Sequence, residues 1–226
     1  MSAEPNAYIM ARPQSLAIRI VARMRRKMYD RFLAMSNIAP DETLLDVGAT
    51  GARDYDSFNY VEAWYPHKHN ITAVGLDDAS YLETAYPGVT FRQADGRNLP
   101  FADRSFDVVH SSAVLEHVGN TDNQKQFVSE LLRVARRGIF LTTPNRWHPV
   151  EFHTILPLVH WLPKRVFRAC LRGTRYDFYA SEDHLNLLGR RDLQELIPRG
   201  YSFQLSSVRL IGLPSNLMVW IEKQNG

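Results

Sequence analysis

Short apolar runs alternate with segments of helical periodicity through the first two thirds of this chain. Helical spacing occurs at residues 79–86 and again at 121–136, where Phe127, Leu131 and Val134 share one side. The apolar or alternating runs have the length of strands and lie at residues 43–47, 71–76, 89–94, 106–110 and 138–142. Strands that alternate with helices at this spacing predict a parallel sheet with helices on both faces.

A basic amphipathic helix is predicted ahead of the first strand, at residues 15–35. Val21, Met24 and Met28 recur there at three- and four-residue steps, whereas the arginines lie on another face. Residues 1–14 show little periodicity, and we expect them to form a loose tail.

The alternation stops after the fifth predicted strand. Residues 143–180 carry four prolines and seven aromatic side chains, and this segment is too long and too apolar for a plain connection. We therefore expect an inserted cap. The alternation resumes with a helix near 190–197 and strands near 203–208 and 217–221.

These patterns predict an α/β protein with a doubly wound, mostly parallel sheet and an inserted helical cap. Four parts are expected in chain order: an N-terminal tail with the basic amphipathic helix at 1–40, a ligand-binding α/β core at 41–142, the aromatic and basic cap at 143–180, and a C-terminal segment that completes the sheet at 181–226.

Composition agrees with a globular protein of one domain with appendages. The chain has 226 residues, of which 45% are hydrophobic and 23% charged, and a core of this size needs no staple. A single cysteine excludes a disulfide within the chain. The N-terminus lacks the pattern of a signal peptide, and no apolar stretch reaches the roughly 20 residues of a membrane span. The expected location is the cytoplasm.

Charge is distributed unevenly along the chain. Residues 1–40 carry a net +5, residues 41–132 a net −9 and residues 133–175 a net +8. The basic segments are either solvated faces or surfaces that attract anionic partners such as phosphates, nucleic acid or a membrane.

Polar residues and glycines follow the predicted strands, at the edge where ligands of open parallel sheets bind. The first strand continues into Asp46-x-Gly48-x-x-Gly51, whose glycines allow a close approach of the backbone to a ligand. The second ends at Asp77, where a carboxylate can accept hydrogen bonds from ribose hydroxyls.

The third and fourth strands end in the same manner. Asp95-Gly96 follows the third strand, and Ser111 ends the fourth. Each aspartate also has an ordinary interpretation, as a helix cap, a helix-start carboxylate or a turn residue. Four consecutive strand ends with polar groups favour a ligand-binding edge.

Several of these motifs resemble those of the class I S-adenosylmethionine-dependent methyltransferases, in the small-molecule branch of the type 11 kind. Residues 44–51 (Leu-Leu-Asp-Val-Gly-Ala-Thr-Gly) resemble the first motif of that family, and residues 74–77 (Val-Gly-Leu-Asp) the second. Residues 94–101 and 105–109 resemble the adenine-side and fourth-strand motifs, and residues 114–118 the segment that follows. The resemblance implies seven strands with a late antiparallel one, and S-adenosylmethionine as cofactor.

The resemblance also implies a role for each residue of the first motif. Gly48, Ala49, Thr50 and Gly51 would line the methionine end of the cofactor, and Asp46 would lie beside its amino group. The family usually has glycine where this chain has Thr50, whose side chain would crowd the cofactor carboxylate or form a hydrogen bond with it.

The remaining strand ends receive roles in the same way. Asp77 would bind the ribose hydroxyls, and its neighbour Asp78 is the better candidate for a helix cap, although the two could exchange roles. Asp95 would accept a hydrogen bond from the adenine amino group, Gly96 would give room, and Ser111 would lie near the sulfonium.

His117 and the preceding Glu116 are the candidates for catalysis. A histidine near the reaction centre can serve as a general base because its pKa lies near neutrality, but it can equally be a packed structural residue. No metal site is expected, because no close carboxylate or cysteine set accompanies His148, His153 and His160 of the cap.

The acceptor is expected to be a small molecule, a lipid or a sugar, methylated at oxygen or carbon. Nucleic acid is disfavoured, because methylases of base amines carry an Asp/Asn-Pro-Pro-aromatic motif where this chain has His110-Ser111-Ser112-Ala113. Lys164, Arg168 and Arg172 recur at four-residue steps in the cap. Such a basic helix suits an acceptor with an anionic head and an apolar tail, or peripheral contact with a membrane.

Two other functions stay open at this point. A nicotinamide-dependent oxidoreductase would need the spacing Gly-x-Gly-x-x-Gly, which the loop at 48–52 lacks. A non-catalytic module that docks to a membrane or a protein partner is the other alternative, and Thr50 is the residue that favours it. The sequence leaves the oligomeric state open.

Overall fold

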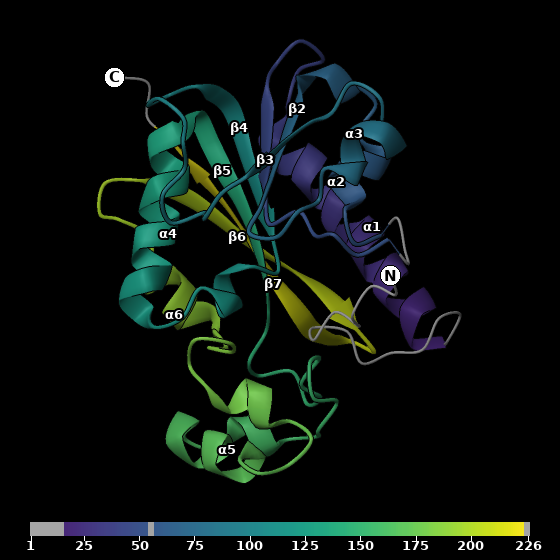
Figure 1. Ribbon diagram of the computed structural model, residues 1–226. Coiled ribbons are helices and arrows are strands. Elements are labelled where there is room, and N and C mark those ends of the chain that lie inside the picture. The colour runs from purple at the N-terminus through teal and green to yellow at the C-terminus, as the bar shows by residue number, and fades with distance from the viewer. Residues whose placement is uncertain (1–15, 54–56, 224–226) are drawn as a thin grey trace.

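Seven strands form one sheet at the centre of the molecule (Figure 1). They are β1 (Leu44–Val47), β2 (Ile71–Gly75), β3 (Thr90–Gln93), β4 (Phe106–Ser112), β5 (Ala135–Pro144), β6 (Ser202–Leu210) and β7 (Leu213–Glu222). Their order across the sheet is β3-β2-β1-β4-β5-β7-β6. The computed structural model describes residues 16–53 and 57–223, so the predicted tail at 1–14 lies outside the described residues.

Strand β7 is antiparallel to both of its neighbours, β5 and β6, whereas β1 to β5 pair in parallel. The reversal follows from the short turn between β6 and β7, in which Ile211 and Gly212 have φ angles of 51° and 79°. Two consecutive positive φ angles are typical of a tight hairpin turn. The predicted α/β class and the mostly parallel seven-stranded sheet with one late antiparallel strand are confirmed.

Helices cover both faces of the sheet, as predicted (Figure 1). In the described residues the α-helices are α1 (Leu16–Ser36), α2 (Tyr60–Trp64), α3 (Tyr81–Ala85), α4 (Thr121–Val134), α5 (Lys164–Leu171) and α6 (Arg190–Glu195). Helices α1, α2 and α3 lie on one face and α4 and α6 on the other, while α5 lies beyond the sheet.

The boundary between α4 and β5 differs from the prediction. The helix ends at Val134 instead of residue 136, and β5 begins at once and continues to Pro144. The strand is longer than its apolar run because β4 pairs with its start at Ala135 and β7 pairs with it from Gly138 to Pro144. Local apolar patterning does not reveal such a long-range partner.

Helix α4 anchors the core on its side of the sheet. It begins after Asn120, whose side-chain oxygen accepts a hydrogen bond from the Asn123 N–H at 2.9 Å. The predicted apolar side of the helix is confirmed, because Phe127, Leu131 and Val134 are buried in one hydrophobic cluster with residues of β1, β4, β5 and β7.

Helix α1 belongs to the core on the opposite face. It contacts β5, β6 and β7. Phe32 is fully buried, and its ring centroid lies 5.4 Å from that of Phe140 and 4.9 Å from that of His110. Tyr29 packs edge-on against Tyr60 of α2. The basic helix is therefore a packed layer of the fold.

The cap is an excursion of the chain beyond the carboxyl end of β5 (Figure 1). Its two ends meet where Asn145 pairs with Leu188, and the Arg146 N–H donates to the Leu188 carbonyl at 3.0 Å. Phe167 and Leu171 of α5 contribute to a small hydrophobic core of its own. None of the described helices, in the cap or elsewhere, is long and apolar enough to cross a membrane.

We expect Phe32→Ala to lower the free energy of unfolding by about 3–5 kcal/mol, because it removes a fully buried ring from a packed interface. Urea denaturation measures this change. Lys27→Ala is the matched control, since Lys27 is exposed on the same helix and its loss should change stability by less than about 0.5 kcal/mol. Equal effects of the two substitutions would contradict the packing role of α1.

Candidate functional site

The loop after β1 packs so closely on its neighbours that glycine is required in it. Gly48 has a φ angle of 118°, and a Cβ atom there would lie 2.1 Å from Cγ2 of Val114. A Cβ atom on Gly51 would lie 2.8 Å from the carbonyl oxygen of Asp78. The loop is thus wedged between the segments that follow β2 and β4, at the carboxyl edge of the sheet.

Asn59 fixes the same loop from the side of α2. The Thr50 N–H donates to Asn59 Oδ1 at 2.9 Å, and Asn59 Nδ2 donates to the Thr50 carbonyl at 2.9 Å. Tyr81 contributes its hydroxyl, which donates to the Ala52 carbonyl at 2.9 Å. The backbone amide of Thr50 therefore already has a protein acceptor.

Asp46 is buried at the end of β1 and is paired with a histidine. Its Oδ1 accepts a hydrogen bond from Nδ1 of His110 in the neighbouring strand β4. His110 Nε2 lies 2.8 Å from the Tyr60 hydroxyl. Burial lowers the pKa of His110 to about 3, so the ring is neutral, with its hydrogen on Nδ1.

A second carboxyl group, that of Glu62, is fully buried beside this pair. Burial raises the pKa of Asp46 to about 7. Burial and the nearby Asp46 carboxylate raise the pKa of Glu62 well above its usual range. At least one of the two carboxyl groups is therefore protonated near neutrality, which reduces the charge beneath the loop.

A small pocket lies at this place. It opens between the carboxyl ends of β1 and β4 and the start of α2, and polar groups from both strands reach it. Its lining residues are Asp46, Gly48, Phe58, Tyr60, Val61, His110 and Ser112.

Asp77 and Asp78 follow β2 and are both exposed. Asp78 Oδ1 accepts a hydrogen bond from the Ser80 N–H at 2.9 Å, and this bond is the first cause of its lowered pKa. Leu76, beside Asp77, leaves 69% of its surface exposed. Asp78 is therefore occupied in the turn before α3, whereas Asp77 extends along the exposed edge.

Asp95 is already engaged by Arg97. The Arg97 guanidinium donates to both carboxylate oxygens, at 2.6 and 3.0 Å, and these bonds lower the pKa of Asp95. The neighbouring Gly96 has no room for a side chain, since a Cβ atom would lie 2.5 Å from the Phe127 ring. A ligand at Asp95 would have to share its carboxylate with Arg97.

Ser111 stands near the end of β4 with an unpaired hydroxyl. It is buried, and its Oγ atom has no hydrogen-bond partner among the described residues. The next residue, Ser112, shares a hydrogen bond of 2.8 Å with Thr142 of β5. A buried hydroxyl with no partner is costly, which favours a ligand group at this position.

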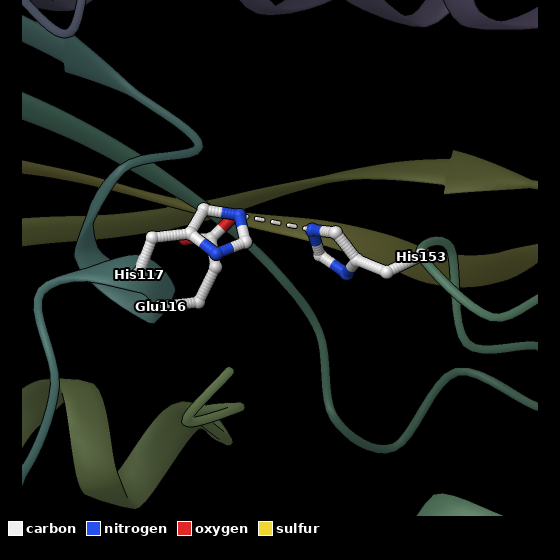
Figure 2. A group of neighbouring side chains, drawn as sticks. All are labelled: Glu116, His117 and His153. Atoms are coloured by element: carbon white, nitrogen blue, oxygen red, sulfur yellow. Dashed lines mark hydrogen bonds and ion pairs between the residues drawn. The ribbon is translucent and has the colours of Figure 1, made fainter. Parts of the chain in front are cut away.

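Glu116 and His117 lie in the short 3₁₀ turn that follows β4 (Leu115–His117), and the fold brings His153 of the cap against them (Figure 2). The two Nε2 atoms of His117 and His153 are 3.1 Å apart, and His117 Nε2 lies 3.9 Å from Glu116 Oε1. Glu116 is anchored through Oε2, which accepts a hydrogen bond of 2.9 Å from Thr143.

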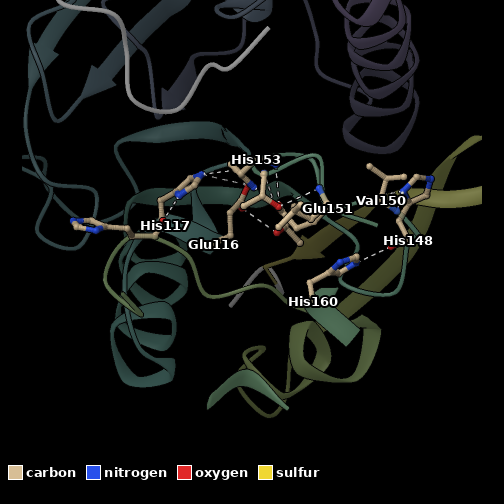
Figure 3. Close-up of polar contacts among 11 residues, drawn as sticks. Glu116, His117, His148, Val150, Glu151, His153 and His160 are labelled. Carbon is tan, nitrogen blue, oxygen red and sulfur yellow. Dashed lines mark hydrogen bonds and ion pairs between the residues drawn. The ribbon is translucent and has the colours of Figure 1, made fainter. Parts of the chain in front are cut away.

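Both imidazole rings are oriented through their other nitrogen atoms (Figure 3). His117 Nδ1 lies 2.6 Å from the His184 carbonyl oxygen, and His153 Nδ1 lies 2.6 Å from Glu151 Oε1. The expectation that no carboxylate accompanies the cap histidines is therefore wrong for His153. His148 and His160 lie apart from this cluster, and the His160 ring instead bonds to the His148 carbonyl at 2.7 Å.

Burial separates the pKa values of the two catalytic candidates. It lowers the pKa of His117 to about 3 and raises the pKa of Glu116 to about 7. Glu116 Oε1 has no hydrogen-bond partner among the described residues. Of the two, Glu116 has the pKa that suits a base at neutral pH.

Five residues of these two clusters were not among the sequence candidates: Tyr60, Glu62, His110, Glu151 and His153. A signal existed only for His110, a polar residue inside the buried apolar run of β4. His153 comes from a segment without periodicity, so its meeting with His117 depends on the cap fold.

The cap presents cations toward a second small pocket. Lys164 and Arg168, predicted on a basic helix face, are turned partly inward, and they donate to Asn186 Oδ1 at 2.7 Å and Glu182 Oε1 at 2.9 Å. Together with Arg146 and His160 they contribute to the lining of this pocket. Arg165 and Val166 lie on the exposed side of α5.

Residues 45–142 match a family model described as "Methyltransferase domain". The chain is 42% identical over 79 residues to a "Probable S-adenosylmethionine-dependent methyltransferase" of Mycolicibacterium smegmatis, which is 32% of this chain and 30% of that protein. It is 37% identical over 106 residues to an "Uncharacterized methyltransferase" of Mycobacterium avium, which is 44% of this chain and 38% of that protein. The matches thus span about a third of these curated relatives.

Solved structures agree on the fold. A protein of Pyrococcus horikoshii aligns with a TM-score of 0.62 at 15% identity, over 93% of each chain. The magnesium protoporphyrin IX methyltransferase of Synechocystis, with bound SAH, aligns with a TM-score of 0.59 at 14% identity, over 96% of this chain and 91% of that one. At such identities the likeness concerns the arrangement of helices and strands alone.

The raised pKa of Asp46 should make the wild type less stable as the pH rises. We expect Asp46→Asn to abolish this dependence, because asparagine does not ionise. Folding raises the pKa of Asp46 from 3.8 to about 7, so the contribution of its protonated form is complete below about pH 4 and is lost as the pH approaches 7. Between these values the free energy of unfolding of the variant should rise relative to wild type by on the order of 4 kcal/mol. Chemical denaturation at several pH values measures it.

Asp107→Asn provides the control of opposite sign. Burial tends to raise the pKa of Asp107, but hydrogen bonds from Thr43 and Arg136 lower it overall. Its contribution should be present above about pH 4 and lost on acidification. A difference between Asp46→Asn and wild type that stays constant with pH would contradict the raised pKa.

Proposed function

We propose that this chain, which belongs through residues 45–142 to the class I S-adenosylmethionine-dependent methyltransferases, transfers a methyl group to a small amphiphilic acceptor. The observation that carries the proposal is the set of strand ends at one sheet edge: the glycine loop at 48–51, the exposed Asp77 and the buried, unpaired hydroxyl of Ser111.

The residues at this edge suit the cofactor. The amino-acid end would lie against the glycine loop beside the small pocket at Asp46, where the raised pKa values of Asp46 and Glu62 reduce the negative charge. We assign Gly48, Ala49, Thr50 and Gly51 to the methionine end. The Thr50 amide is bonded to Asn59, so Thr50 would contribute its side chain rather than its N–H.

The nucleoside end would lie along the exposed part of the edge. Asp77 would accept hydrogen bonds from the two ribose hydroxyls, and the exposed Leu76 offers an apolar contact for the adenine ring. Asp95 would accept a hydrogen bond from the adenine amino group while its bonds with Arg97 remain, and Gly96 allows the loop to pack on Phe127. Asp78 is assigned to the turn before α3 instead of the ribose, because it already caps the Ser80 N–H.

When bound, S-adenosylmethionine supplies a methyl group on a sulfonium that an acceptor oxygen or carbon can displace in line. The chain mainly has to align the acceptor, and Ser111 near the end of β4 would lie beside the reacting centre. An oxygen acceptor also loses a proton, and Glu116 Oε1 is buried, unpaired and of suitable pKa to take it. His117 would be neutral and would position the acceptor.

The cap favours an acceptor with an anionic head and an apolar tail. Its second pocket is lined by Arg146, Lys164 and Arg168, which suit a phosphate or carboxylate. Several of the exposed large apolar side chains lie in the cap and form what we call the cap surface: Trp147, Ile155, Leu158, Trp161, Leu162 and Val166. Exposed apolar side chains beside cations are typical of contact with a lipid surface.

Titration calorimetry of the full chain with S-adenosylmethionine and with its demethylated product tests the cofactor site. We expect binding in the wild type and a loss of at least about tenfold in Asp77→Ala, which removes a charged acceptor of two hydrogen bonds. Asp122→Ala, at an exposed carboxylate in the first turn of α4, is the control and should bind as wild type. Absence of binding up to millimolar concentration would instead favour the non-catalytic module.

Sedimentation with vesicles of phosphatidylcholine and phosphatidylglycerol tests the cap surface. We expect the wild type to bind at low salt, and the double substitution Trp161→Ala and Val166→Asp to weaken binding at least about fivefold because it removes apolar contact and adds a negative charge. Ile211→Ala is the control, since Ile211 is 92% exposed in the turn between β6 and β7, outside the cap. Equal binding of all three proteins would contradict a membrane role for the cap.

A further inference from the structure

The hydrogen atoms of His117 and His153 are assigned by their partners. The His184 carbonyl oxygen can only accept, so His117 Nδ1, 2.6 Å away, carries a hydrogen. His153 Nδ1 faces Glu151 Oε1 at 2.6 Å, and Glu151 also accepts from the Thr154 N–H and hydroxyl, as an ionised carboxylate does. With its hydrogen on Nδ1, each ring presents a lone pair on Nε2 whenever the ring is neutral.

These two lone pairs converge on a third acceptor. The Nε2 atoms are 3.1 Å apart, and Glu116 Oε1 joins them so that all three atoms lie within 4.8 Å of one another (Figure 2). Two lone pairs at this distance repel each other unless a positive charge lies between them. A proton on one ring would satisfy the two nitrogen atoms but would leave the buried Glu116 Oε1 without a partner.

We propose that Glu116, His117 and His153 bind one divalent transition-metal cation of the Zn²⁺ kind, through Glu116 Oε1 and the two Nε2 atoms. Imidazole nitrogen with one carboxylate oxygen suits Zn²⁺ better than the oxygen-seeking Mg²⁺ or Ca²⁺. The cation would satisfy all three acceptor atoms at once.

The charges of the cluster match such an ion. In the state that binds a metal, both imidazole rings are neutral and Glu116 and Glu151 are ionised, which gives a net charge of −2 that a divalent cation neutralises. Ligand atoms at roughly 2.1 Å from a tetrahedral metal lie roughly 3.4 Å apart. The 3.1 Å and 3.9 Å separations of the cluster need only small side-chain movements to reach this value.

Outer contacts of the three ligands have the form found around metal sites. Glu151 holds the Nδ1 hydrogen of His153, the His184 carbonyl holds that of His117, and Thr143 holds the second oxygen of Glu116 (Figure 3). Such partners fix the ring orientation and raise the basicity of the ligand atom. The cluster thus has both a ligand set and the groups that orient it.

Three protein ligands leave a coordination position open, as in catalytic zinc sites. This consequence rests on the proposed methyl transfer: the open position would take the acceptor oxygen and lower the pKa of its hydroxyl. Glu116 and His117 would then act as ligands. The acidified hydroxyl would give its proton to water, and its oxygen would take the methyl group as the carbon–sulfur bond of the sulfonium breaks to leave the demethylated product.

Metal binding by the full chain, stripped with a chelator and dialysed, tests the proposal without any methyl acceptor. We expect one equivalent of Zn²⁺ by calorimetry, and a Co²⁺ form with the visible absorption of a four- or five-coordinate site. Glu116→Gln and His153→Gln should each weaken Zn²⁺ binding by more than about 100-fold, and Glu151→Gln by about 10- to 100-fold. Circular dichroism verifies that each variant is folded. If His153→Gln does not fold, the proposal is tested with Glu116→Gln alone.

His160→Gln is the matched control, because His160 is a cap histidine that bonds to the His148 carbonyl outside the cluster. It should bind Zn²⁺ as the wild type does. Absence of a stoichiometric site in the wild type, or equal losses in His160→Gln and Glu116→Gln, would overturn the proposal. The S-adenosylmethionine titration is run on the same samples. Zn²⁺ binding without cofactor binding would contradict only the proposed function. Cofactor binding without Zn²⁺ binding would contradict only the metal site.

Discussion

The contact between Gly48 and Val114 is the constraint on which the rest of the site depends. A Cβ atom on Gly48 would overlap Val114 at 2.1 Å, so the loop after β1 and the segment after β4 can approach each other only without a side chain there. Because Glu116 and His117 come only two and three residues after Val114, the same contact sets the acceptor-side cluster against the cofactor-side loop. The absence of a side chain at Gly48 therefore allows the cofactor-side loop and the acceptor-side cluster to lie next to each other.

The sheet edge was predictable because its signals are local. Asp46, Asp77 and Ser111 each follow or end a strand that an apolar run predicts, and parallel strands bring their carboxyl ends to one edge. The turn role of Asp78 has a local signal too, since a carboxylate two residues before Ser80 can accept from its N–H. The partnership of Asp95 with Arg97 was not foreseen, although the two are close in sequence, because either residue could have pointed to solvent.

The buried polar clusters could not be predicted, because they join residues far apart in the chain. Asp46 meets His110 only through the pairing of β1 with β4. His153 meets His117 only because the cap folds back on the turn after β4, held there by Asn186, whose N–H donates to the Glu116 carbonyl at 2.7 Å. The cap has neither helical nor strand periodicity over most of its length, so its internal arrangement comes from its own small core.

We infer that the carboxyl edge of the sheet holds S-adenosylmethionine, with its amino-acid end at the glycine loop and its ribose at Asp77. A crystal structure of the chain with the demethylated product of this cofactor bound tests the inference most directly. We expect density along residues 48–51, with the ribose hydroxyls within hydrogen-bond distance of the Asp77 carboxylate. Density for the product elsewhere on the molecule, or an edge that stays filled by the chain's own side chains at saturating product, would contradict it.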